Sequence, residues 1–146
     1  MTPLDLTARP PRSCYEELDG LMLLPRTIDK MRALLPGGKP GVYLINAHIV
    51  GISGYLLSRL GVSEDEFREA VAAAHDDTEV AAWLRTRTDA SKYAEINAAL
   101  RKIRRKHVED QAFFNRMYAD VLAADPQLEY IFDIVDADDR LMFGRA

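Results

Sequence analysis

KYAEINAALRKIRRKHVEDQAFFNRMYADVLA, residues 92–123, is the stretch that decides the fold class. Side chains spaced by alternating steps of three and four residues form one stripe through it, and such a stripe is one face of a helix. The stripe consists of Tyr93, Ile96, Leu100, Ile103, His107, Asp110, Phe114, Met117 and Val121. The pattern predicts either one long helix over about 92–123 or two helices that break near residues 106–110. The break is favoured there because His107 and Asp110 are polar.

Helix-start signals lie upstream of this stretch. Ser63 and Glu66 form a capping box, in which each side chain binds the other residue's backbone amide, and Phe67 begins the apolar pattern behind it. Asp77 or Thr78 is expected to cap the next helix. Each of these signals is local, so each predicts a separate helix of ordinary length.

Further helices are predicted toward both ends of the chain. One begins at Pro25, which suits a first helical turn, and another runs from about Ser53 to Gly61. After Asp125 the pattern predicts a short last helix and then a short acidic tail. Strand patterns are nearly absent, although 42–45 fits a short strand or an extended segment. We therefore expect one all-α domain over 1–146, a compact bundle of about five to six helices with an extended N-terminal arm at 1–13.

Charge and cysteine content exclude several classes of protein. The formal net charge is −4, which disfavours nucleic acid as a partner because its binders usually present a basic face. The basic run 101–107 is expected to be a solvated helix face. Cys14 is the single cysteine, so no internal disulfide forms and the expected location is cytoplasmic. With no long apolar run, neither a signal peptide nor a membrane partner is expected.

Basic side chains near the N-terminus are the first candidate site. Arginine forks bind carboxylates and phosphates through paired hydrogen bonds, and a helix start near the glycines at 51 and 54 offers backbone amides to the same anion. The alternative is that the arginines form ion pairs with Asp29 and pin the arm to the core. The ligand-binding candidates are Arg9, Arg12, Arg26, Asp29, Lys30 and Ser53.

Other polar groups give weaker signals. Tyr43, Asn46, His48 and Ser53 fit either a pocket lining or a turn with a capping serine. The histidines lack metal-site spacing. The acidic residues at 133–139 lack the glycine and glutamate of a calcium loop, so a solvated or cap-forming turn is favoured. We expect no metal site and no cofactor.

Several blocks of the chain share the residues of one known family. They are Leu4–Ser13, Leu24–Ala33, Gly51–Gly61 and Glu79–Leu84, with Asp138-Asp139-Arg140 and Phe143 near the end. In combination they resemble a bacterial family described only as a domain of unknown function, number 5069. The resemblance implies a cytoplasmic bacterial protein and supplies no activity. Its motif residues in this sequence are Asp5, Thr7, Arg9, Arg12, Arg26, Asp29, Lys30 and Ser53.

Three functional hypotheses follow from these observations. The first is a helical domain that binds a small anionic ligand through the N-terminal cluster of arginine and lysine. The second is a protein-interaction or oligomerisation module, such as a homodimer, that uses the 93–121 stripe or the acidic tail. The third is an enzyme in the same pocket with Asp29 or His48 as acid or base. Binding or interaction ranks above catalysis because the sequence contains no readable nucleophile–base pair.

Overall fold

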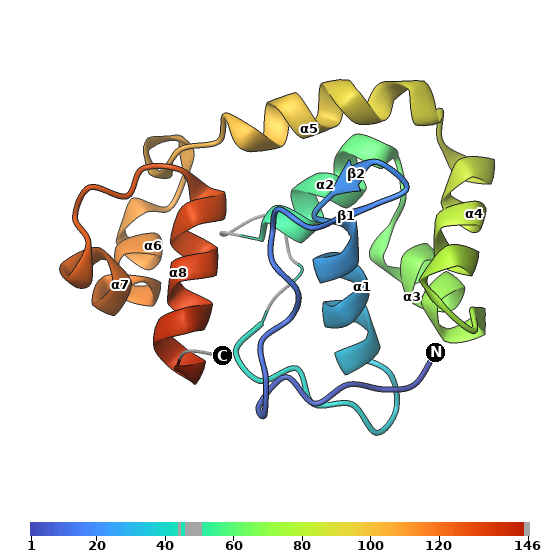
Figure 1. Ribbon diagram of the computed structural model, residues 1–146, viewed down its shortest axis with the longest axis horizontal. Coiled ribbons are helices and arrows are strands. Elements are labelled where there is room, and N and C mark those ends of the chain that lie inside the picture. Colours follow the sequence, from blue (N-terminus) through green and yellow to red (C-terminus); the bar gives the residue numbers. More distant parts are fainter. Residues whose placement is uncertain (44, 46–50, 145–146) are drawn as a thin grey trace.

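The computed structural model describes residues 1–43, 45 and 51–144. This part of the chain is mostly helical, with one small sheet (Figure 1). The elements, in order, are β1 (Glu17–Leu18), β2 (Leu21–Met22), α1 (Leu24–Ala33), α2 (Ile52–Leu60), α3 (Glu64–Ala73), α4 (Asp77–Arg87), the 3₁₀ turn η1 (Ala90–Lys92), α5 (Tyr93–Arg101), the 3₁₀ turn η2 (Arg105–His107), α6 (Gln111–Met117), α7 (Ala119–Ala124) and α8 (Ile131–Phe143). The described residues thus contain eight α-helices, more than the five to six predicted.

The two strands form a hairpin that the all-α prediction missed. Glu17 pairs with Met22 and Leu18 with Leu21, and the turn residue Asp19 has a φ of 55°. Gly20, with a φ of 78°, completes a turn in which both central residues are left-handed, as two-residue hairpins require. A two-residue strand is too short to show alternation, so the Asp-Gly pair was its only sequence signal.

Helix α1 lies at the centre of the molecule, with α3 and α4 on one side and α8 on the other (Figure 1). Pro25 lies in its first turn as predicted, and every residue from 24 to 31 is buried. Buried apolar side chains from the hairpin and all eight helices form one hydrophobic cluster with it. The charged residues of α1 therefore enter the interior with the helix.

Local signals placed the middle helices correctly to within a residue or two. Helix α2 ends at Gly61, whose φ of 71° makes it a left-handed cap. The capping box of Ser63 and Glu66 is present at the start of α3. Asp76 caps α4, so the prediction of Asp77 or Thr78 was wrong by one residue. The Asp77 carboxylate instead binds Arg12.

The 92–123 stretch forms three α-helices, so the prediction of one long helix was wrong. The predicted break near residues 106–110 is present, between the end of α5 at Arg101 and the start of α6 at Gln111, but a second break was not predicted. After α5 the chain pairs with the segment before α8: the Arg105 amide donates to the Glu129 carbonyl at 2.7 Å, and the Ile131 amide donates to the Ile103 carbonyl at 3.0 Å. Asp110 then caps α6, and a further break follows at Tyr118. The apolar residues of the stripe are buried or partly buried, whereas its two polar residues, His107 and Asp110, are exposed between α5 and α6.

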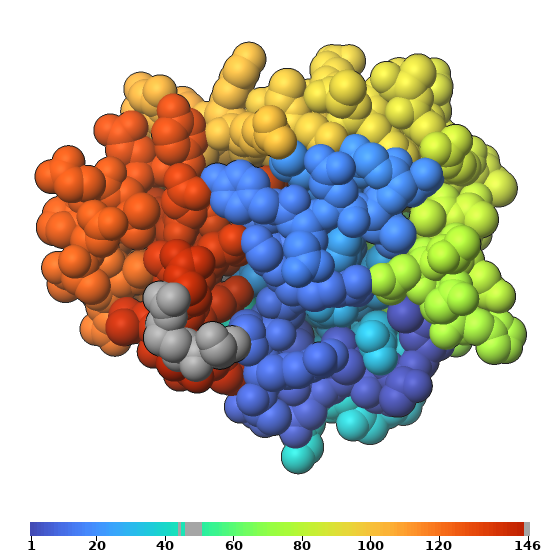
Figure 2. Space-filling model, viewed as in Figure 1, coloured from blue at the N-terminus to red at the C-terminus, as the bar shows by residue number. Residues whose placement is uncertain are grey.

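The N-terminal arm and the last helix both pack against the rest of the described structure. In the N-terminal arm, Leu4 and Leu6 exchange backbone hydrogen bonds with Lys39, and the Met1 amino group donates to the Ala74 carbonyl at 2.6 Å. Figure 2 shows this N-terminal part of the chain across the front face. The prediction of a short last helix and an acidic tail was wrong, because the acidic residues lie on α8, the longest described helix. Within the described residues, no helix has the length and apolar character needed to cross a membrane.

Candidate functional site

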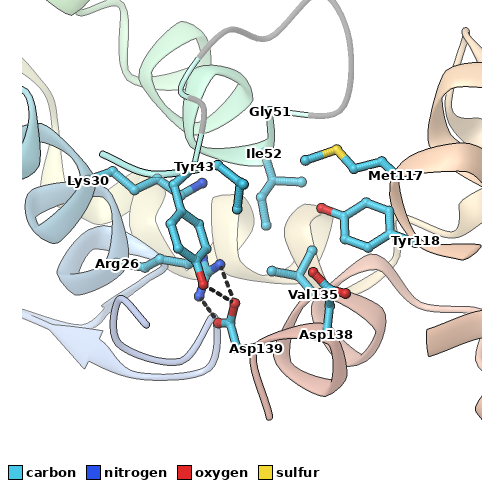
Figure 3. A pocket seen from close by; sticks show the side chains of 11 residues that line it. Arg26, Lys30, Tyr43, Gly51, Ile52, Met117, Tyr118, Val135, Asp138 and Asp139 are labelled. Atoms are coloured by element: carbon cyan, nitrogen blue, oxygen red, sulfur yellow. Dashed lines mark hydrogen bonds and ion pairs between the residues drawn. The ribbon is translucent and has the colours of Figure 1, made fainter. Parts of the chain in front are cut away.

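A buried ion pair joins the central helix to the last one. Arg26 of α1 donates to the Asp139 carboxylate of α8, with 2.6 Å between Nη1 and Oδ2. The Arg26 side chain is 1% exposed. The Tyr43 hydroxyl donates to the same carboxylate at 2.7 Å, and the Tyr43 ring lies 5.5 Å from the guanidinium carbon. This cluster closes one end of a cleft (Figure 3).

A second ion network holds the N-terminal arm. Arg12 donates to both oxygens of Asp29 at 3.0 Å and to Asp77 at 2.6 Å. The Arg12 backbone amide also donates to Asp29 at 2.8 Å. The Arg12 guanidinium thus forms ion pairs with two carboxylates of the protein itself. This is the alternative to ligand binding that the sequence analysis describes.

Ser53 lies inside α2 rather than at its cap. Its hydroxyl is hydrogen-bonded to that of Thr27 at 3.0 Å, and both side chains are fully buried. This contact fastens α2 to α1. The helix is capped instead by Gly51, which has no side chain to bind the first amides of the helix.

The cleft lies between α1, the start of α2, the α6–α7 junction and α8. Its cavity volume is about 30 Å³, enough for one or two water molecules. The residues lining it are Arg26, Lys30, Val42, Tyr43, Gly51, Ile52, Met117, Tyr118, Val135, Asp138 and Asp139. In Figure 3, Lys30 and Tyr118 enter from opposite sides.

Two groups in the cleft titrate close to neutral pH. Burial, with the neighbouring Arg26 cation, lowers the pKa of Lys30 to about 7. Burial, with repulsion from Asp139 and Asp120, raises the pKa of Asp138 to about 6. Burial and its bond to Asp139 raise the pKa of Tyr43 as well. Such shifts gather where a site holds charged or reacting groups.

The charges that line the cleft come from different helices, and Arg26 and Asp139 meet in the ion pair at one end of it. Arg26, Lys30 and the start of α2 form a positive side, because the first amides of a helix carry partial positive charge. Asp138 and Asp139 on α8 form the negative side. Among the described residues, no group of three histidine, cysteine or acidic side chains has a metal-site arrangement.

The structure divides the residues named from the sequence into three groups. Arg26 and Lys30 line the cleft, whereas Arg12, Asp29 and Ser53 lie in the neighbouring contacts described above. Arg9 is exposed. Asn46 and His48 lie outside the described residues.

The sequence analysis did not identify Asp138 and Asp139 as residues of the cleft. Asp139 lies four residues after Val135 and seven after Phe132, so it falls on the buried face of α8. A carboxylate on an apolar helix face is a readable signal, whereas the missing calcium-loop residues favoured a solvated or cap-forming turn over 133–139. Tyr118 was missed because it lies beside the stripe, next to Met117.

The comparisons with known proteins identify the family. No curated protein matches the chain. The family model described as "Domain of unknown function (DUF5069)" matches residues 8–141, which include both ion networks and all the residues that line the cleft. The chain therefore belongs to the DUF5069 family.

Proposed function

We propose that the protein binds a small anionic ligand, through a carboxylate or phosphate group, at the cleft between α1, α2 and α8, where the cavity of about 30 Å³ takes up one or two oxygen atoms of that group. The observation that carries the proposal is the meeting of Arg26, Lys30 and the Gly51-capped start of α2 in one cavity. Two side-chain cations and a helix start that has no side-chain cap form an anion site by simple electrostatics.

An unsatisfied donor supports this assignment. Among the described residues, Nε of Arg26 is one of two buried side-chain polar atoms without a hydrogen-bond partner. An unpaired buried N–H costs about 1–3 kcal/mol, so a buried donor of this kind in a cleft-lining residue favours a ligand that accepts from it. Of the candidates named from the sequence, Arg26 and Lys30 would contact the ligand. Arg12, Asp29 and Ser53 would instead hold the arm and the helices in place.

The interaction-module alternative has less support, because much of the apolar stripe packs inside the molecule. Tyr93, Ile96, Leu100 and Phe114 of the stripe are each at most 4% exposed. The acidic tail is α8, whose Asp139 is bound to Arg26. The site is expected to operate in the cytoplasm, since Cys14 is free and buried beside the ion pair.

Titration calorimetry with inorganic phosphate and with acetate tests the proposal. Lys30→Gln is expected to weaken binding roughly tenfold to 100-fold, because it removes a charged donor. Arg12→Ala is the control: it removes a cationic side chain that does not line the cleft and is expected to leave affinity unchanged. Equal loss of affinity in both variants, or no binding by the wild-type chain, contradicts the proposal. Circular dichroism verifies that each variant is folded.

A further inference from the structure

Exposed apolar side chains gather at the C-terminal end of α8. Among the described residues, five large apolar side chains are exposed, and three of them, Val42, Leu141 and Met142, line one groove beside α8. Leu141 is 52% exposed. Apolar side chains that cluster on a surface, rather than lie scattered over it, mark a site of interaction.

A second groove lies on the other side of Leu141, between α7 and α8. Along α8, positions 138 and 142 line the first groove, whereas positions 137, 140 and 144 line the second. Leu141 lines both and is therefore the ridge between them. In Figure 1, α7 and α8 lie side by side, at the end of the molecule away from α3 and α4. The second groove, called here the α7–α8 groove, has a volume of about 450 Å³ and is lined by Val121, Ala124, Asp125, Leu128, Ala137, Arg140, Leu141 and Gly144.

Two opposite charges line this largely apolar groove. Arg140 and Asp125 are both exposed, and neither forms an ion pair within the part of the chain that the structure describes. The Asp125 carboxylate accepts only a local bond, from the backbone amide of Gln127 at 3.1 Å. The groove thus offers one charge of each sign. A partner with a single sign of charge is attracted at one side and repelled at the other, whereas a partner with the same two charges matches both.

We propose that the α7–α8 groove is the contact surface of a homodimer. Leu141 of each copy enters the groove of the other, and Arg140 pairs with Asp125 across the contact. A two-fold interface uses the same patch on both subunits, so each such contact occurs twice. A groove that has a leucine at its edge and one charge of each sign meets this condition by itself. The first groove is a poorer seat for Leu141 because Asp120 and Asp138 line it, and covering carboxylates is costly.

The proposed contact is separate from the anion site. No described residue lines both the α7–α8 groove and the cleft. Dimer formation and phosphate binding are therefore tested independently, and failure of one leaves the other as it stands.

Sedimentation equilibrium of the whole chain tests the proposal. A contact built on one groove is expected to be smaller than a standard interface of about 800 Å² per partner, so we expect a weak dimer in exchange with the monomer. From micromolar to millimolar concentration, the measured mass should rise from 16.4 kDa toward twice that value. A wild-type mass that stays at 16.4 kDa throughout overturns the homodimer, whatever else covers the groove.

Two leucine variants locate the contact. Leu141→Asp is expected to weaken association roughly tenfold or more, because it places a charge at the centre of the interface. Leu34→Asp is the matched control, since Leu34 is 37% exposed and is not among the described residues that line either groove. Equal loss of association in both variants, each verified as folded by circular dichroism, overturns the assignment to this groove.

An exchange of charges tests the pairing of Arg140 with Asp125. Arg140→Asp and Asp125→Arg each bring like charges together at both contacts, so each variant alone is expected to associate at least roughly tenfold more weakly than wild type. In an equal mixture of the two variants, opposite charges meet at both contacts, and a mixed dimer of about wild-type affinity is expected. A mixture that associates no more tightly than the separate variants overturns the pairing.

Discussion

Arg26 and Asp139 are 113 residues apart in the sequence and form a buried ion pair, with 2.6 Å between Nη1 and Oδ2. The same carboxylate accepts the Tyr43 hydroxyl, so one side chain of α8 positions two residues of the cleft. The Arg26 guanidinium also donates from Nη1 to the Arg12 carbonyl at 3.1 Å. The pair thus links the arm, the central helix and the last helix.

Asp139→Ala is expected to be strongly destabilising. It leaves Arg26 charged and buried without its carboxylate, which typically costs about 3–5 kcal/mol. Urea denaturation measures the loss in unfolding free energy. The double variant Arg26→Met with Asp139→Leu is expected to recover most of it, because apolar side chains need no compensating charge. A single variant as stable as wild type contradicts a structural role for the pair.

Arg12→Ala is expected to lower stability without affecting the ligand. The Arg12 side chain is 32% exposed, so the loss is smaller than for Asp139→Ala, about 1–3 kcal/mol. Thermal denaturation with and without phosphate distinguishes the two effects. The midpoint falls in the variant, while the upward shift caused by phosphate stays as in wild type. If the folded variant no longer shows the shift with phosphate, Arg12 takes part in ligand binding and the prediction is wrong.

Gly51→Asp is expected to abolish anion binding while preserving the helix. Gly51 has a φ of −77°, which any residue adopts, and an aspartate at this position caps the first amides of α2. Capping of this kind contributes about 0.5–2 kcal/mol, but its carboxylate occupies the place of the ligand. Calorimetry with phosphate and urea denaturation together make the test. Retained affinity shows that the start of α2 takes no part in binding.

Stability is expected to depend on pH in two separate windows. The folded-state pKa of Lys30 is about 7 against an ordinary value of 10.5. The unfolded chain therefore binds more protons between these values, and the unfolding free energy rises with pH from about 7 to 10.5. For Asp138 the pKa rises from 3.8 to about 6, so its contribution is present below pH 3.8 and is lost as pH rises to about 6.

Urea denaturation across pH 4 to 10 measures both windows. We expect Lys30→Gln to flatten the upper rise and Asp138→Asn to flatten the lower fall, each leaving the other limb in place. A wild-type stability that stays constant between pH 7 and 10 contradicts the displaced pKa of Lys30.

Local signals in the sequence determined where several helices begin and end. The capping box at Ser63, the first-turn Pro25 and the left-handed Gly61 are found at the predicted places. These features depend on hydrogen bonds and backbone angles within one helical turn, which the neighbouring residues alone specify. The family blocks likewise needed no structure, and the family match over 8–141 covers them except for residues 4–7 and Phe143.

Only the tertiary structure decided how the helices break and which charges meet. The stripe in 92–123 specified a buried face, but the pairing of Arg105 with Glu129 ended α5 through a contact between distant segments. The same holds for the choice of Arg26, rather than Arg12, as the partner of Asp139. An arginine forms the same fork with any carboxylate, so its partner is determined by which helices pack together, a long-range outcome of burying the whole core.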